Sequence, residues 1–302
     1  MFKEHKIKNI ACIGAGIIGH SWAILFAMKG YSVNIYDVNE ESIKSAFLRI
    51  KVALNLCVEK KLIEERDAEE AYNRVKVKLD ISKAVSDADY VVESTLENYD
   101  VKKKIFREMD EAAPEEAILA SSSSGLLMSI IQKVTEKPER CIVAHPFNPP
   151  HLIPLVEIVP GECTSETTVK QTVLLMKRLG KVPIVIRKEV SGYLANRLQR
   201  GIMQQANDIV NSGIANVEDV DRALSAGPGI RWAIYGKYLQ DYFNAPSHLM
   251  RHQQRSGLVA KGYEEYGLLK GKSFEDMVRW RDSKLIDILR VLGHLPQSET
   301  KK

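Results

Sequence analysis

The sequence predicts an α/β fold: a doubly wound, mainly parallel sheet followed by an all-helical C-terminal domain. Strand-like and helix-like segments alternate from residue 7 to residue 187, as they do in parallel sheets. The glycine turn GAGIIG joins the first strand to the first helix. Beyond residue 187 only helical periodicity remains. The 302 residues suffice for two domains of ordinary size, and we predict them at 1–189 and 190–302.

The composition excludes several classes of protein. The 43 basic and 39 acidic residues leave a net charge of only +4, and no basic run is interleaved with aromatic residues, so we expect no nucleic-acid partner. No apolar run reaches the roughly 20 residues that cross a bilayer, and no signal peptide begins the chain, which predicts a cytoplasmic protein with no membrane partner. Four scattered cysteines without metal-ligand spacing predict reduced core thiols and no metal site: Cys12, Cys57, Cys141 and Cys163.

The first three elements form a βαβ unit. We predict a strand at Ile7–Ile13, a helix at Ile17–Lys29 that ends at Gly30, and a second strand at Ser32–Tyr36. This order of strand, glycine turn, helix and strand is typical of a Rossmann-type dinucleotide-binding domain.

Each glycine of the turn has a physical reason. Gly14 permits the tight turn, Gly16 lets a pyrophosphate approach the backbone, and Gly19 lets the helix pack closely on the strand. The pyrophosphate then meets the free N–H groups of the helix start, at Ile17 and Ile18. Asp37, at the end of the second strand, can accept hydrogen bonds from the adenine ribose and would repel a 2′-phosphate, so NAD is favoured over NADP.

The alternation then continues. Helical periodicity covers 40–60, 64–73 and 101–113, and strand-like segments cover 75–79, 89–95 and 117–121. Candidate polar residues follow the carboxyl ends of these strands, where ligands bind in such sheets. They are Glu97, Lys102, Ser124 and His145.

The stretch AHPFNPPHLIPLVEIV predicts a pair of catalytic type. A strand at Arg140–Ala144 leads His145 into a turn rich in Pro and Asn, and Glu157 follows inside a buried strand at Leu155–Val159. A carboxylate beside a histidine makes the imidazole oriented and basic enough to take a proton. The alternative is a buried structural ion pair, because an acid among apolar neighbours needs a partner in either case.

The second half is predicted to be helical. After a last strand at Lys181–Arg187, we expect helices at Ser191–Ser212, Val217–Ser225, 247–269 and 274–292. Asn216 is a good N-cap for the second of these, with Asp219 three positions on.

Five sequence pieces resemble the 3-hydroxyacyl-CoA dehydrogenase family. They are GAGIIG with Asp37, VVESTLENYDVKKKIF, ASSSSGL, AHPFNPPHLIPLVEIV and GYLANRL. The resemblance implies His145 as catalytic base with Glu157 as its partner. It also implies Ser124 and Asn196 as hydrogen-bonding groups at the reacting oxygen. The nicotinamide half of NAD would contact Glu97, Lys102 and Asn148.

The C-terminal half departs from the acyl-CoA members. GPGIRWAIYG replaces their YPMGP-type motif, and their closing GxGFY segment is absent. With SSSSG, HPFNPP and NRLQ, these features resemble the L-gulonate 3-dehydrogenase/lambda-crystallin branch. The L-carnitine dehydrogenases are also similar, but the resemblance associates an acidic residue with the position of Asn196.

Arg231 of the divergent segment could clamp a substrate carboxylate, or it could be a surface residue that covers Trp232. Four basic residues in or beside the helices predicted at 40–60 and 64–73 could meet coenzyme A phosphates or form a solvated face. They are Lys51, Lys60, Lys61 and Arg66.

We therefore predict NAD-dependent oxidation and reduction at C3 of a 3-hydroxy acid or 3-hydroxyacyl-CoA. Three alternatives stay open. The first is a free-acid dehydrogenase for L-gulonate or L-carnitine. The second is a nonenzymatic crystallin-like NAD-binding protein. The third is a hydroxy-acid dehydrogenase with a catalytic lysine, against which the chain has Asn196 and Arg197 at the start of its helical domain. The resemblance and the apolar C-terminal helices also predict a homodimer.

Overall fold

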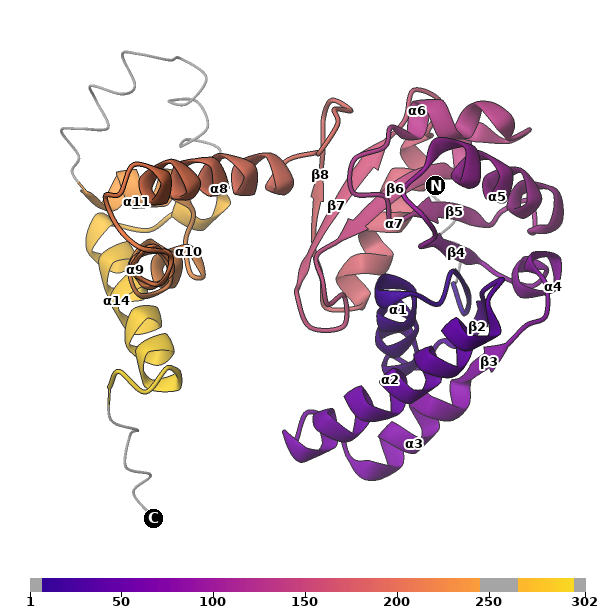
Figure 1. Ribbon diagram of the computed structural model, residues 1–302, viewed down its shortest axis with the longest axis horizontal. Helices are drawn as coiled ribbons and strands as arrows, with labels where there is room; N and C mark the ends of the chain where they lie inside the picture. The colour runs from indigo at the N-terminus through magenta and orange to yellow at the C-terminus, as the bar shows by residue number, and fades with distance from the viewer. Residues whose placement is uncertain (1–6, 245–265, 296–302) are drawn as a thin grey trace. The chain divides into compact units, whose positions relative to one another are not determined.

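Eight strands form one sheet in the order β3-β2-β1-β4-β5-β6-β7-β8 (Figure 1). The computed structural model describes residues 7–244 and 266–295. All neighbouring strands run parallel except β6 and β7, which are antiparallel. The predicted doubly wound, mainly parallel sheet is confirmed. The strands are β1 (Asn9–Ile13), β2 (Ser32–Tyr36), β3 (Val75–Val77), β4 (Tyr90–Glu93), β5 (Ile118–Ser121), β6 (Cys141–Pro146), β7 (Leu155–Pro160) and β8 (Val182–Val185).

Helices cover both faces of this sheet, because successive side chains of a strand point to opposite faces. In β1, Ile10 and Cys12 join one buried cluster, while Ala11 and Ile13 join the other. The first cluster is completed by α1 (Ile17–Met28), α2 (Glu40–Glu59), α3 (Glu65–Arg74) and α7 (Glu166–Arg178). The second is completed by α4 (Ile81–Val85), α5 (Tyr99–Ala112) and α6 (Met128–Ile131). Short 3-10 helices follow at Gln132–Val134 and Pro138–Arg140.

The helix predicted from Ser191 instead begins at Ala195, as α8 (Ala195–Asn211). Gly192 has φ +73° and Tyr193 has φ +44°, so both lie in the left-handed region. Left-handed residues cannot continue a right-handed helix, and this short segment forms the sharp lead-in to α8.

One predicted helix and one predicted core thiol differ from the structure or fall mostly outside its described residues. The helix predicted over 247–269 falls mostly outside the described residues, and its described end is only a 3-10 helix at Gly267–Leu269. Among the cysteines, Cys163 is exposed and is not a core thiol, whereas Cys12, Cys57 and Cys141 are buried as predicted.

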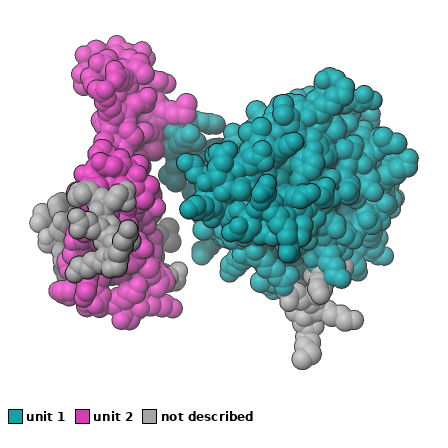
Figure 2. All heavy atoms as spheres, turned by 90° about the horizontal axis from the view of Figure 1, so that it is seen from below, with its two compact units in different colours: residues 1–200 teal, residues 201–302 magenta. Residues whose placement is uncertain are grey.

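The chain divides into two compact units, Met1–Arg200 and Gly201–Lys302, which Figure 2 colours separately. The described part of the second unit is helical, as predicted, and Asn216 caps α9 through a 2.8 Å bond from the Asp219 N–H. The predicted domain boundary after residue 189 stays a prediction. Within the described ranges, no helix has the length and apolarity to cross a membrane. The described α-helices of this unit, besides the end of α8, are α9 (Val217–Ala226), α10 (Pro228–Trp232), α11 (Lys237–Asn244) and α14 (Phe274–Val291).

Candidate active site

His145 and Glu157 face each other across an antiparallel hairpin. The register of β6 and β7 pairs the two residues directly, and His145 Nδ1 lies 2.8 Å from Glu157 Oε2. His145 is the fifth residue of β6 and does not lie in the turn, which corrects the sequence-based expectation. The hairpin explains why residues twelve positions apart meet. Both are buried, with exposed fractions of 6% and 0%.

The surroundings of Glu157 favour its charged form. Its second oxygen, Oε1, accepts hydrogen bonds of 2.9 Å from the backbone N–H groups of Leu194 and Ala195, at the start of α8. Burial raises the pKa of Glu157, but the hydrogen bonds from His145, Ala195 and Leu194 outweigh it, so the pKa is lowered overall. A charged Glu157 accepts the Nδ1–H of a neutral His145, which leaves the lone pair on Nε2.

Two aromatic rings fix the plane of the imidazole. Phe147 and Tyr193 lie 5.3 Å and 5.4 Å from it between ring centroids, both in edge-on arrangements. The hydroxyl of Tyr193 donates a 2.7 Å hydrogen bond to the Leu126 carbonyl, which fixes the position of the ring beside His145. Sequence reasoning missed Tyr193, although its place in GYLANRL was the available signal.

A cavity of about 580 Å³ opens beside His145. It brings together six of the predicted residues from separate loops and elements: Ile18, Glu97, Lys102, Ser124, His145 and Asn148. Asn196 of α8 also lines it, together with Gln199, to which the sequence analysis gave no role although it ends the piece NRLQ. Arg231 lies in α10 of the second unit, so its role at this cavity stays a prediction.

Glu97 organises the serine run that follows β5. Its Oε1 accepts bonds from the Ser123 hydroxyl (2.7 Å), the Ser124 N–H (2.8 Å), the Gly125 N–H (3.0 Å) and the Ser124 hydroxyl (3.2 Å). Burial raises the pKa of Glu97, but the hydrogen bond from Ser123, the charge of Lys102 and the bonds from Ser124 outweigh it and lower the pKa. Asn196 adds a 3.1 Å bond from its amide to the Ser124 carbonyl, so α8 and the serine run are tied together.

Lys102 is buried beneath this loop, paired with Glu93. Its ammonium lies 2.7 Å from Glu93 Oε1 and 3.6 Å from Glu97 Oε2. Glu93 also accepts 2.6 Å bonds from the hydroxyls of Ser121 and Thr95, and it is fully buried. Sequence reasoning missed Glu93, although a carboxylate ending the apolar run of β4 signalled a buried partner.

The glycine turn has the shape that a dinucleotide requires. A Cβ on Gly14 would lie 2.6 Å from the Ser94 carbonyl oxygen, and one on Gly19 would lie 1.8 Å from that of Gly14. A Cβ on Gly16 would meet nothing within 4 Å, and no side chain caps α1 there, so no capping side chain competes with a ligand for the N–H groups at the helix start. Asp37 accepts a 2.8 Å bond from the Ala15 N–H, which fixes its carboxylate against the turn. These residues fit NAD.

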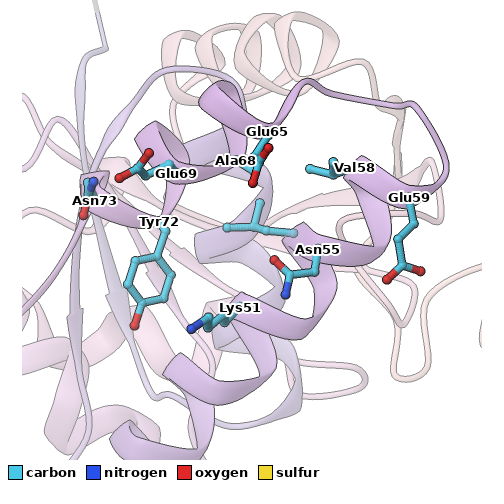
Figure 3. A pocket seen from close by; sticks show the side chains of 10 residues that line it. Lys51, Asn55, Val58, Glu59, Glu65, Ala68, Glu69, Tyr72 and Asn73 are labelled. Atoms are coloured by element: carbon cyan, nitrogen blue, oxygen red, sulfur yellow. The ribbon is translucent and has the colours of Figure 1, made fainter.

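A second cavity, of about 710 Å³, lies between α2 and α3 (Figure 3). Three of its lining residues are carboxylates, Glu59, Glu65 and Glu69, against the single ammonium of Lys51. This balance of charge disfavours a polyanionic ligand. No group of three or more His, Cys, Asp or Glu residues in the described ranges could hold a metal ion.

Comparison with family models matches both parts of the chain. Residues 9–190 match the model "3-hydroxyacyl-CoA dehydrogenase, NAD binding domain", and residues 192–283 match "3-hydroxyacyl-CoA dehydrogenase, C-terminal domain".

Individual proteins agree with this match. The chain is 37% identical to an L-carnitine dehydrogenase of Bacillus cereus, over 82% of this chain and 75% of that protein. It is 37% identical to the human lambda-crystallin homolog, over 80% of this chain and 76% of that protein. A solved (S)-3-hydroxybutyryl-CoA dehydrogenase from Ralstonia eutropha is similar with TM-score 0.69 and 29% identity, over 74% of this chain and 78% of that one.

Proposed function

We propose that His145 is the general base of this chain. The chain belongs to the 3-hydroxyacyl-CoA dehydrogenase family, so it is an NAD-dependent dehydrogenase that acts on a 3-hydroxy group. The observation that carries the proposal is the 2.8 Å contact between His145 Nδ1 and Glu157 Oε2, beside a cavity of about 580 Å³. Glu157 holds the proton of the neutral imidazole on Nδ1, so Nε2 is the atom that takes the hydroxyl proton.

In the oxidation direction the imidazole becomes a cation as it takes this proton. Glu157 stabilises the cation and keeps the ring from rotating, as a carboxylate does in other His-carboxylate pairs. Bound NAD supplies the acceptor for the hydride that leaves C3. General-base help of this kind contributes about 10²–10⁴-fold to the rate.

Ser124 and Asn196 hold the reacting oxygen. The Ser124 hydroxyl makes the longest (3.2 Å) of the four hydrogen bonds to Glu97 Oε1, and we propose that it turns to donate to the reacting oxygen when substrate binds. Asn196 uses one amide N–H for the Ser124 carbonyl and has a second N–H that can donate to the oxygen as it becomes a carbonyl. Both residues can therefore donate to the oxygen as it becomes a carbonyl, while its hydroxyl proton goes to His145 Nε2.

The cofactor residues keep the roles predicted for them. We propose that the turn of Gly14, Gly16 and Gly19, with the start of α1 at Ile17 and Ile18, receives the pyrophosphate. Asp37 would bind the adenine ribose. For the nicotinamide half we propose Glu97, Lys102 and Asn148, supported by their shared place in the lining of the cavity.

We propose a free 3-hydroxy acid with a polar chain as the substrate, and not a coenzyme A thioester. Ile18, Pro146 and Phe147 are the apolar members of a cavity lining that is otherwise polar or charged. The carboxylates that line the cavity between α2 and α3 would repel the phosphates of coenzyme A. The uncharged Asn196 suits a hydroxylated chain better than the quaternary ammonium of L-carnitine, and Arg231 is the proposed partner of the carboxylate.

NADH formation or consumption with L-gulonate, L-carnitine, 3-hydroxybutyryl-CoA and acetoacetyl-CoA, compared side by side, tests this choice. We expect turnover with L-gulonate and little with the other three. A clear preference for the two thioesters would contradict the free-acid proposal and favour a role in fatty acid metabolism. Absence of turnover with all four would contradict the substrate class and favour the nonenzymatic crystallin-like alternative.

We also propose a cytoplasmic homodimer. The three buried cysteine thiols suit a reducing compartment. The described helices of the second unit expose large apolar side chains, among them Val217 at 64% and Val291 at 83%, which a partner surface could cover. The molar mass from light scattering tests the dimer, and a monomeric mass would contradict it.

A further inference from the structure

Gln199 of α8 lines the cavity and has no role in the reaction proposed above. Gln199 lies three positions after Asn196, so the two side chains share one face of the helix. Each residue advances about 1.5 Å along the axis, which puts Gln199 about 4.5 Å beyond Asn196. That offset corresponds to a few carbon–carbon bonds past the reacting carbon.

The two amides differ in how they are engaged. Asn196 donates to the Ser124 carbonyl, 3.1 Å away, and is thereby fixed against the serine run. Gln199 is exposed to the cavity and, among residues 7–244 and 266–295, has no hydrogen-bond partner for its amide. A primary amide both donates and accepts, which is the pattern that a substrate hydroxyl matches.

We propose that Gln199 determines specificity, by binding a hydroxyl group on the substrate chain beyond C3. The inference rests on the proposed oxidation of a free 3-hydroxy acid, and it narrows that class to acids with a polyhydroxylated chain. Gln199 takes no part in proton or hydride transfer. Its loss therefore weakens the binding of hydroxylated substrates and leaves the chemical step intact.

The test compares Gln199→Leu with the wild type on L-gulonate and on 3-hydroxybutyrate, whose chain ends without a further hydroxyl. A hydrogen bond in a solvent-accessible cavity contributes about 3–10-fold to binding. We expect kcat/KM for L-gulonate to fall by about this factor through KM, with kcat unchanged. For 3-hydroxybutyrate we expect kcat/KM to stay the same or rise.

Gln204→Leu is the matched control, because it makes the same change at an exposed position of α8 outside the cavity. It should leave both substrates unaffected, and NADH affinity should be equal in all three proteins. If Gln199→Leu behaves like Gln204→Leu while the wild type still prefers L-gulonate, the role of Gln199 is refuted and the proposed function stands. If it weakens both acids equally, the specificity role is also refuted. A wild type that works only on thioesters, or on none of these compounds, overturns the proposed substrate class itself.

Discussion

The glycine turn and the β6–β7 hairpin build their sites in opposite ways. At the turn, side chains are missing where backbone must come close, as at Gly19, where a Cβ would lie 1.8 Å from a carbonyl oxygen. At the hairpin, two buried ionisable side chains meet at 2.8 Å and both carboxylate oxygens of Glu157 have hydrogen-bond partners. A cofactor that is bound through its phosphates needs backbone N–H groups and space. A proton transfer needs a side chain in one protonation state and one orientation.

We expect the largest loss of activity from a substitution in the hairpin. His145→Gln removes the base while keeping a polar side chain of similar reach. We expect kcat to fall by up to about 10⁴-fold, since general-base catalysis contributes about 10²–10⁴-fold. Steady-state rates and NADH titration by fluorescence measure the two properties separately. Equal loss of NADH affinity would contradict this role and mean that the His145 side chain itself belongs to the cofactor site.

Glu157→Gln tests the orientation of the imidazole. The carbonyl of the new amide can still accept from Leu194 and Ala195, but its NH₂ then faces His145 Nδ1 and moves the ring proton to Nε2. We expect a fall in kcat of about 10²–10³-fold, somewhat less than the ~10⁴-fold of the comparable change in a Ser-His-Asp triad. The pH profile of kcat/KM should change shape along with the rate. A rate loss with an unchanged profile would indicate a purely structural role.

Gly16→Ala and Gly19→Ala divide the turn into its two functions. Gly19→Ala forces a Cβ against backbone and should lower the free energy of unfolding without cofactor by about 1–3 kcal/mol. Gly16→Ala has open space around it and should leave that free energy unchanged, while weakening NADH binding about tenfold by occupying the pyrophosphate position. Urea denaturation and NADH titration of both variants check this. Identical behaviour of the two would contradict the division.

A smaller effect concerns acid stability. The pKa of Glu157 is lowered in the folded protein from its usual 4.5, so its stabilising contribution is complete above pH 4.5 and disappears as the pH falls through the lowered folded value. Glu157→Gln should therefore show a shallower loss of stability on acidification than the wild type. Urea midpoints between pH 6 and pH 3 measure it, with the exposed Glu69→Gln as control. Parallel curves for the wild type and Glu157→Gln would contradict the assignment.

The part of the molecule that sequence could predict is the part governed by local rules. Glycine spacing, apolar runs and the acid after β2 predicted the βαβ unit, and Ser32–Tyr36 matches β2 residue for residue. The meeting of Glu93 with Lys102, and of Tyr193 with His145, depends on how α5 and the segment before α8 pack against the strand ends, and no local pattern carries that information. His145 was expected in a turn because of the prolines after it, but hairpin pairing extends β6 through Pro146.

The bonds from Leu194 and Ala195 to Glu157 have a consequence for exchanging parts between relatives. A chimaera joined at residue 189 would draw these two backbone donors from the other parent, and the charge of the dyad would depend on a foreign segment. The donated piece should start after Gln199 if the chemistry of this chain is to be kept with a new set of C-terminal helices. The residues that the catalytic site needs therefore extend into the first turns of α8, and a chimaera should be joined after them.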